Sequence, residues 1–542
     1  MKFLNFLHKR LRLSSLHRSI STAGYQVNQQ KSKSCPSYYV VIGGISLAAL
    51  ITLNSNRTLN DDNTLAEDIA KSGVNIHFYN EVVKILDSSQ ININFDDLQQ
   101  HGKPYSSYHE SSKIPNIILL PKSTEDVSNI VKLCKKYHVP IVPYGGATSL
   151  EGQILTLQGG VSLDFTLMKE IVNINKNDLD ITVQAGLGYI ELNEYLKPLG
   201  LCFPLDPGPG ATIGGMCACR CSGSTAVKYG SMRENVLNLT AVLADENGTI
   251  IKTGSRARKS SAGYDVTRLL IGSEGTLAII TEATLKLHTI PKISYSLRIS
   301  FPSVKEASNT AATTFTSGIN IRRCELMDDE MVKIINKVHP TMKPWIESNT
   351  LLYEITGLTE EGTLEQVEMV KDIAIKNNAS SIDIATDVTA NNKLWMMRKE
   401  CLWTIMATYP DREPMITDVC VPLTRLAELM LYAKEAIEVS KLPCPIIAHA
   451  GDGNFHVIIM FKPDVPEEVI TAGKLADDLA KKAISMEGTC TGEHGIGVGK
   501  IDLLQLEMGP GTMKVMETIK NGLDPENLLN PGKIFRNKKG CL

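Results

Sequence analysis

The chain lacks the features that mark disulfide-stapled or nucleic-acid-binding proteins. It holds only 12 cysteines in 542 residues, and no two are spaced as C-x-x-C, which excludes a disulfide scaffold. The formal net charge is −3, so no excess of positive charge favours nucleic acid. We find neither repeats nor low-complexity tracts. A hydrophobic content of 43% at this length predicts a globular protein of several domain-sized units, or of two large ones.

The first 60 residues contain no acidic residue, and the first one is Asp61. Within 1–36, basic residues stand among Leu, Phe and Ser, as in a mitochondrial presequence. An apolar run of 16 residues, 38–53, follows in a segment bounded at 37–53. It is slightly shorter than the roughly 17–25 residues that span a bilayer, so a buried core helix is the alternative. The basic lead and the polar stretch that follows favour a membrane anchor.

Beyond this leader the pattern changes from helical to mixed. Residues 54–110 predict a helical lead, and 111–290 a glycine-rich unit that begins with strand, helix and strand. Ser123 or Thr124 supplies the N-cap of that helix. Residues 291–542 alternate strands with long helices and end in an apolar tail, which we expect to return to the first unit. The chain is therefore expected to be α+β.

Three segments rich in small residues follow one another: PYGGATSLEG at 143–152, DPGPGATIGG at 206–215 and GSEGT at 272–276. Backbone N–H groups crowded in such turns suit a pyrophosphate. The second segment is not a Rossmann fingerprint, because its spacing is one residue too long and prolines precede it. Nor is GIGVGK a P-loop, since His494 stands where the first glycine must be.

The stretch 446–460 places two histidines about a glycine-rich tip. His449 and His456 are flanked by apolar runs that predict two buried strands. Asp452-Gly453 favours a two-residue hairpin turn, since both positions tolerate positive φ. Such a turn would set 449 directly opposite 456, with Cβ atoms about 4.5–5.5 Å apart. Both rings could then reach one metal ion. The alternative is two histidines hydrogen-bonded to neighbouring carbonyls.

A third candidate ligand, Glu493, stands beside His494 in the glycine-rich stretch 488–500. A carboxylate would complete a His-His-Glu set that leaves one coordination position open, as catalytic metal sites do. Zn²⁺ suits these ligands, and Mn²⁺ and Fe²⁺ are alternatives. A protease interpretation fails, because no H-E-x-x-H occurs and Cys490 blocks the inverted H-x-x-E-H form.

The order of the three small-residue segments, with KYG after the second and GYDVTRLLIGSEGTLAIIT as the third, resembles the flavin-binding domain of the vanillyl-alcohol oxidase type. The similarity extends over residues 110–540. It implies a two-part FAD-binding domain followed by an α+β substrate domain with an antiparallel sheet. In that fold the first loop and 211–223 hold the pyrophosphate, and 265–279 lines the adenine and the flavin.

The resemblance thus implies FAD contacts from small, polar and apolar residues of these segments. They are Tyr144, Gly145, Gly146, Ala147, Thr148, Ser149, Pro207, Gly208, Ala211, Thr212, Gly214, Gly215, Ser222, Gly223, Tyr229, Gly230, Asp265, Gly272, Gly275, Thr276 and Ile279. Several relatives tether FAD through a histidine directly after the paired glycines of the first loop. Ala147 occupies that place here and cannot form the bond, so we expect non-covalent FAD.

The resemblance also assigns roles in the second unit. His449, His456 and Glu493 match the ligands of a divalent metal, and His494 matches the proposed catalytic base. Arg398, in LWMMRKECLW, matches the arginine that binds the substrate carboxylate. Zinc-like ions cannot accept electrons, so the flavin must take them.

Together these assignments imply FAD-dependent oxidation of small D-2-hydroxy acids, such as D-lactate to pyruvate, with cytochrome c as the electron acceptor at the mitochondrial inner membrane and the catalytic part facing the intermembrane space. Relatives that act on D-2-hydroxyglutarate carry a lysine and a threonine where this chain has Ile416 and Leu402, which favours a monocarboxylate. Alternatives are a D-2-hydroxyglutarate or glycolate dehydrogenase and, in another class, a flavin-dependent ether-lipid synthase or a non-catalytic flavin-binding module.

Overall fold

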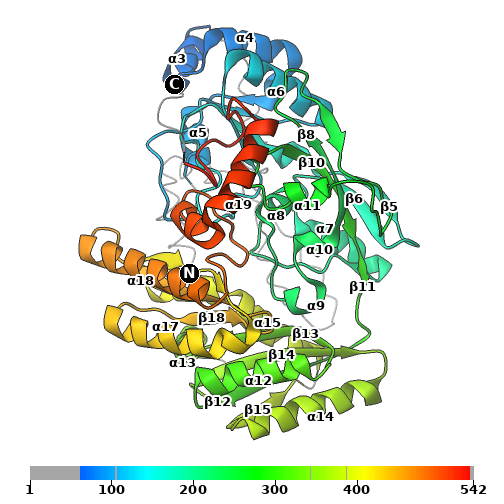
Figure 1. The fold of residues 1–542 in the computed structure, drawn as a ribbon, viewed down its shortest axis with the longest axis vertical. Coiled ribbons are helices and arrows are strands. Elements are labelled where there is room, and N and C mark those ends of the chain that lie inside the picture. Colours follow the sequence, from blue (N-terminus) through cyan, green and yellow to red (C-terminus); the bar gives the residue numbers. More distant parts are fainter. Residues whose placement is uncertain (1–61, 104–106, 342, 386, 537–542) are drawn as a thin grey trace, which may run out of the picture.

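The computed structural model describes residues 62–103, 107–341, 343–385 and 387–536, and Figure 1 shows two parts, one above the other. The predicted presequence and the hydrophobic segment after it lie outside these residues. None of the described helices is both long and apolar enough to cross a lipid bilayer.

The upper part in Figure 1 begins with three helices, α3 (Asp62–Ser72), α4 (Ile76–Ile85) and α5 (Phe95–His101). A small sheet follows in the order β1-β2-β4-β3, in which β2 and β3 each run parallel to β4. Its strands are β1 (Ile91–Asn92), β2 (Ile117–Leu119), β3 (Ile141–Tyr144) and β4 (Val161–Asp164).

The predicted strand–helix–strand unit is confirmed as β2, α6 (Thr124–Tyr137) and β3. Ser123 is the N-cap, because its Oγ accepts a hydrogen bond from the Asp126 backbone N–H at 3.1 Å. Val127, Ile130 and Val131 form the buried face of the helix.

An antiparallel sheet completes the upper part in the order β5-β6-β10-β8-β9. Its strands are β5 (Ile171–Asn175), β6 (Asp180–Gln184), β8 (Val236–Val242), β9 (Ile250–Lys252) and β10 (Ile279–Lys286). Helices α7 (Tyr189–Leu196) and α8 (Ile213–Cys219) share one apolar core with it. A short ladder joins β7 (Leu201–Cys202) to β11 (His288–Thr289), just before the chain enters the lower part.

The lower part is built on one large antiparallel sheet in the order β15-β12-β14-β13-β18-β19-β16, with β17 also paired to β19. The strands are β12 (Ile293–Phe301), β13 (Ile321–Met327), β14 (Asn349–Gly357), β15 (Ser381–Ile384), β16 (Glu413–Ile416), β17 (Val419–Cys420), β18 (Ile446–His449) and β19 (Asn454–Phe461).

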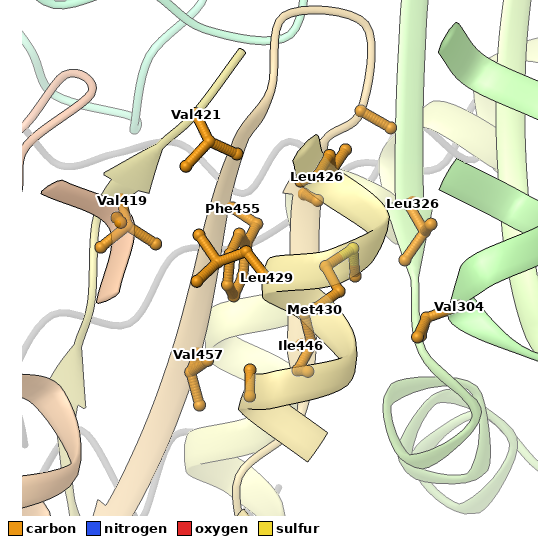
Figure 2. Close-up of a cluster of buried hydrophobic side chains, with 14 of the residues drawn as sticks. Val304, Leu326, Val419, Val421, Leu426, Leu429, Met430, Ile446, Phe455 and Val457 are labelled. Carbon is orange, nitrogen blue, oxygen red and sulfur yellow. The ribbon is translucent and has the colours of Figure 1, made fainter. Parts of the chain in front are cut away.

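Two groups of helices form separate apolar clusters on this sheet. The larger cluster includes α12 (Val304–Thr316), α14 (Glu360–Lys376), α17 (Leu426–Ser440) and α18 (Pro466–Ser485). Figure 2 shows Leu429 and Met430 of α17 packed beside Phe455 and Val457 of β19. The smaller cluster includes α13 (Asp329–Val338), α15 (Val388–Lys399) and α16 (Cys401–Thr408), with Ile447 and Ile458 of the sheet.

The alternation of side chains along β19 decides where the site lies. Because successive strand residues point to opposite faces, Phe455 and Val457 enter the larger cluster while His456 points to the face covered by α15 and α16. His449 and His456 therefore lie on the same side of the sheet as α15, the helix that carries Arg398.

The end of the chain returns to the upper part through α19 (Ile501–Leu523), which is kinked at Gly509-Pro510 and drawn in red in Figure 1. Beyond it, the tail adds to β3. Ile141 donates its N–H to the Leu528 carbonyl at 2.9 Å and accepts the Asn530 N–H at 2.8 Å. Residues nearly 400 positions apart in the chain thus belong to one structural unit.

Candidate functional site

The hairpin that carries the two histidines differs from the predicted one in its register. The structure pairs His449 with Asn454 and Ile447 with His456, so the prediction that 449 lies directly opposite 456 is wrong. Because the side-chain period of a strand is two, this two-residue difference in register leaves both histidines on the same face. Their ring centroids are 5.4 Å apart, and they remain neighbours.

The physical reason is that hydrogen bonds to residues distant in the chain give the hairpin a longer connection than the predicted two-residue turn. The connection spans 450–453 instead of two residues. Gly451 donates its N–H to the Cys324 carbonyl at 3.2 Å, and Val421 donates its N–H to the Gly453 carbonyl at 3.1 Å. A Cβ at Gly453 would overlap the Val421 carbonyl oxygen. The glycine thus permits a close approach at positive φ.

Each histidine is held through Nδ1 and directs Nε2 toward Glu493, the third candidate ligand. His449 Nδ1 donates to Glu325 Oε1 at 2.8 Å, and His456 Nδ1 donates to the Thr417 carbonyl at 3.0 Å. The two Nε2 atoms lie 3.2 Å and 3.5 Å from Glu493 Oε1. Partners of this kind fix the tautomer of a metal-binding histidine. One donor atom from each of the three residues lies within 4.8 Å of the others, so this set could hold one metal ion.

A second set of possible ligands, Asp418, His456 and His494, shares His456 with the first. It is less suited to a metal, because the His456 nitrogen at 3.7 Å from Asp418 is Nδ1. That nitrogen already donates to the Thr417 carbonyl. We therefore favour the set with Glu493.

Glu493 joins the two parts of the molecule. Its Oε1 faces the histidines, while its Oε2 accepts hydrogen bonds from the Ser222 hydroxyl at 2.7 Å and from the Ser222 N–H at 3.2 Å. Burial alone would raise the pKa of Glu493, but His449 and His456 outweigh it and hold the pKa well below its ordinary value. The group is therefore a carboxylate, the form that binds a metal.

His494 lies against the predicted metal ligands. Its ring stacks on that of His456, with centroids 4.9 Å apart and planes at 12°. Its Nδ1 is buried and has no hydrogen-bond partner within the described part of the chain. Burial lowers the pKa of His494, so the imidazole is neutral at neutral pH and able to accept a proton.

Arg398 lies on α15, and its side chain is only 11% exposed. Its guanidinium forms an ion pair with Glu325 at 2.6 Å. The other oxygen of Glu325 holds His449. The Arg398 Nε–H is buried without a hydrogen-bond partner among the described residues, so the guanidinium keeps donors for a further anion.

Two site residues, Glu325 and Asp418, were missed at the level of sequence. Both are buried carboxylates on or next to apolar strands, in CELMD and ITDVCVP. Acidic residues are rarely buried unless paired, so an acid inside an apolar strand pattern was the available signal. Ser222 was predicted as a cofactor contact, and the structure shows it bound to Glu493.

The three predicted cofactor segments converge in the upper part. A Cβ at Gly145 would lie 2.5 Å from Thr212 Oγ1, and one at Gly146 would overlap the Gly210 carbonyl. A Cβ at Gly275 would lie 2.8 Å from Pro143. The Thr212 hydroxyl is buried and has no partner among the described residues. An unsatisfied hydroxyl beside a glycine cradle fits a bound phosphate or flavin oxygen.

Other predicted cofactor residues have structural partners as well. Asp265 caps α11 (Val266–Leu270) by accepting the Arg268 N–H at 3.0 Å. The Pro207 carbonyl accepts the Tyr189 hydroxyl at 2.8 Å. The ring of Tyr229 packs edge-on against His288. These contacts do not test whether Asp265, Pro207 and Tyr229 also contact FAD, so their cofactor roles stay predictions.

Comparison with known proteins agrees with this geometry. The family described as FAD binding domain matches residues 115–254, and the family described as FAD linked oxidases, C-terminal domain, matches residues 290–534. Among solved structures, p-cresol methylhydroxylase has a TM-score of 0.69 at 16% identity, covering 86% of this chain and 98% of that one. Alkyldihydroxyacetonephosphate synthase has a TM-score of 0.67 at 20% identity, covering 84% and 86%. At 16% and 20% identity, the similarity to these two structures shows a shared fold and nothing more.

Curated relatives are much closer in sequence. D-lactate dehydrogenase (cytochrome), mitochondrial, from Arabidopsis thaliana is 49% identical, covering 84% of this chain and 79% of that protein. D-lactate dehydrogenase (cytochrome) 1, mitochondrial, from Saccharomyces cerevisiae is 42% identical, covering 81% and 76%. Glycolate oxidase subunit GlcD from Bacillus subtilis is 32% identical, covering 82% and 94%.

The fold is therefore that of the vanillyl-alcohol-oxidase-type flavoproteins, and the predicted fold class is confirmed. The chain belongs to the FAD-linked oxidase family, whose closely similar members above are mitochondrial D-lactate dehydrogenases of the cytochrome type. It is an FAD-linked oxidoreductase.

Proposed function

We propose that this protein oxidises D-lactate and other small D-2-hydroxy acids to 2-oxo acids. The observation that carries the proposal is the convergence of His449, His456 and Glu493 within 4.8 Å, with His494 stacked beside them. A 2-hydroxy acid offers a hydroxyl and a carboxylate oxygen that suit one metal ion as a pair of ligands. The names of the relatives support the same substrate class.

His449, His456 and Glu493 would hold a divalent metal, with Zn²⁺ the best match and Mn²⁺ or Fe²⁺ also suited to these ligands. When bound, the metal lowers the pKa of a hydroxyl next to it. The fixed Nδ1 hydrogen bonds and the low pKa of Glu493 support this assignment.

The convergent glycine segments and the Thr212 hydroxyl would hold FAD. When bound, FAD supplies the acceptor for the hydride that leaves C2. Ala147 adopts positive φ in the first loop and offers no nucleophile, so the flavin is expected to be non-covalent.

His494 would remove the proton of the substrate hydroxyl, because its neutral ring lies beside the metal ligands and its Nδ1 has no partner among the described residues. Arg398 would bind the substrate carboxylate through the donors that Glu325 leaves unused. The hydroxyl thus loses its proton to His494 and C2 loses a hydride, which yields the 2-oxo acid.

Leu402 and Ile416 pack against the smaller apolar cluster, which includes Trp395 and Met397 of α15, and they offer no cation for a second carboxylate. We therefore favour monocarboxylates over D-2-hydroxyglutarate. Glycolate is the second candidate, because glycolate oxidase subunits are 32% and 31% identical to this chain.

We further propose that the protein acts in mitochondria with cytochrome c as its electron acceptor, as the names of its relatives suggest. Anchoring to the inner membrane through 38–53, with the catalytic part in the intermembrane space, completes the proposal. It is supported by the apolar run and its basic lead.

The test is anaerobic mixing with D-lactate, L-lactate, glycolate and D-2-hydroxyglutarate, followed by loss of the yellow flavin absorbance. D-lactate should bleach the flavin fastest, and oxidised cytochrome c should then restore the colour. Acid precipitation should release the yellow colour into the supernatant. Equal bleaching by both lactate enantiomers would contradict the stereochemical part, and no bleaching would refute the proposed activity.

A further inference from the structure

The stretch 488–500, called here the catalytic loop, carries Glu493 and His494 but has few side chains that could hold it in place. Five of its 13 residues are glycine. Glycine adds backbone freedom and no packing, yet a metal ligand and a base need fixed geometry, and small displacements of such groups cost rate. Something outside the loop must therefore fix its backbone.

Asp418, between β16 and β17, makes the contacts that fix it. One oxygen, Oδ2, accepts the backbone N–H groups of Glu493 and His494, both at 2.8 Å. The same oxygen accepts the Thr491 hydroxyl at 2.9 Å. The other oxygen, Oδ1, accepts Asn454 Nδ2 at 2.9 Å. The carboxylate is buried, so these bonds are shielded from water.

We propose that Asp418 is a positioning residue that sets the metal ligand Glu493 and the base His494 together, through a single carboxylate oxygen. The inference rests on the proposed function for the roles of those two residues. One oxygen bound to two consecutive N–H groups fixes the peptide between them, and with it the directions in which both side chains leave the backbone.

The proposal requires a carboxylate at this position, because every partner of Asp418 is a donor. The two oxygens of Asp418 accept four hydrogen bonds, from Asn454 Nδ2, the Thr491 hydroxyl and two backbone N–H groups, and such donors favour the carboxylate form. Asparagine has one acceptor oxygen and one donor NH₂ group. In Asp418→Asn, the new amide can be placed in two orientations. In one its NH₂ faces Asn454 Nδ2, and in the other it faces the three donors of the catalytic loop, so a donor meets a donor in both.

The chain offers a matched control in the same loop. Glu507 on α19 accepts the Cys490 N–H at 2.9 Å and the Thr489 hydroxyl at 3.0 Å. Both bonds go to one oxygen, Oε2, so a glutamine carbonyl can accept them as well, and no hydrogen bond joins Glu507 to Glu493 or His494 among the described contacts. Glu507→Gln makes the same change of carboxylate to amide away from the two site residues.

The experiment compares wild type, Asp418→Asn and Glu507→Gln as purified flavoproteins. Zn²⁺ affinity is measured by competition with a chromogenic chelator. The rate of flavin reduction by D-lactate is measured per bound flavin and per bound Zn²⁺, with and without deuterium at C2. For Asp418→Asn we expect Zn²⁺ affinity and reduction rate each to fall about 10- to 100-fold, the range for groups that orient metal ligands. Glu507→Gln should stay near wild type.

A purely structural role would lower the yield of folded protein and leave the rate per bound flavin and Zn²⁺ unchanged. Loss of positioning lowers kcat with little change in KM and raises the isotope effect, because the chemical step then limits turnover. If Asp418→Asn shows the same Zn²⁺ affinity and the same rate of flavin reduction as Glu507→Gln, the proposal is overturned.

If Asp418→Asn does not fold, Thr491→Val removes one of the bonds to Oδ2, together with the contact of the same hydroxyl to the Gly495 carbonyl at 2.9 Å, and should give a smaller loss of the same kind. Wild-type kinetics in this variant would then overturn the proposal. Failure of the proposed function is distinguishable, since wild type would not be reduced by D-lactate. The Zn²⁺ affinities of Asp418→Asn and Glu507→Gln would still decide the role of Asp418.

Discussion

At the scale of single residues, one buried carboxylate joins the two halves of the candidate site. Glu325 holds His449 through one oxygen and Arg398 through the other. The orientation of His449, a predicted metal ligand, and that of Arg398, the proposed carboxylate-binding cation, therefore depend on the same side chain. Removing one member of such a buried network leaves the others uncompensated.

Glu325→Gln should accordingly weaken both functions at once. Its amide presents a donor to either His449 or Arg398, so one contact is lost whichever way it turns. We expect Zn²⁺ affinity to fall about 10- to 100-fold and KM for D-lactate to rise, measured by chelator competition and steady-state kinetics.

Glu354→Gln is the matched control, since Glu354 is also buried and pairs with Arg322 and Arg323 on the neighbouring strand. It should lower thermal stability without loss of Zn²⁺. Unchanged Zn²⁺ affinity in Glu325→Gln would show that Glu325 does not orient His449.

At the scale of elements, the β18–β19 hairpin shows what a sequence pattern can and cannot predict. The apolar runs and the shared face of the two histidines were predictable, because alternation along a strand is local. The register was not, since it depends on where the tip touches residues distant in the chain, such as Cys324 and Val421. Glu325 was missed for the same reason, as it lies 124 positions from His449.

Gly453→Ala tests whether the tip sets the site. The new Cβ would overlap the Val421 carbonyl oxygen at a positive φ, so we expect a loss of about 1–3 kcal/mol in the free energy of unfolding. His449 should shift with the tip, so Zn²⁺ affinity should fall while flavin stays bound.

Gly473→Ala is the control, because it lies inside α18 with open space around its Cβ position. Alanine there should stabilise the protein by about 0.5–1 kcal/mol. Denaturant unfolding and Zn²⁺ titration check both variants. If Gly453→Ala is as stable as wild type, the expected overlap between the new Cβ and the Val421 carbonyl oxygen does not occur.

At the scale of the whole molecule, the catalytic loop is held from both parts. From the upper part, Gln153 donates to the His494 carbonyl at 2.8 Å, and Glu274 accepts the N–H groups of Ile496 and Gly497 at 2.6 Å and 2.7 Å. Asp418 holds it from the lower part. The predicted flavin segments and the predicted metal ligands are thereby fixed relative to each other. The three glycine segments were predictable from the sequence as a set, whereas their junction with this loop required the folded chain.

This arrangement predicts that metal and flavin are separable in binding but not in function. The residues predicted to bind FAD belong to the upper part, and two of the three predicted metal ligands belong to the hairpin of the lower part. A chelator should therefore remove the metal and leave the yellow flavin bound. D-lactate should then fail to bleach it, because the substrate hydroxyl would keep its high pKa and His494 could not remove its proton.

Dithionite should still bleach the flavin, which shows that the flavin itself remains reducible. Adding back Zn²⁺, Mn²⁺ or Fe²⁺ separately should restore bleaching by D-lactate and reveal which ion the ligands prefer. Bleaching at the wild-type rate in metal-free protein would mean that the His-His-Glu set has no part in the chemistry.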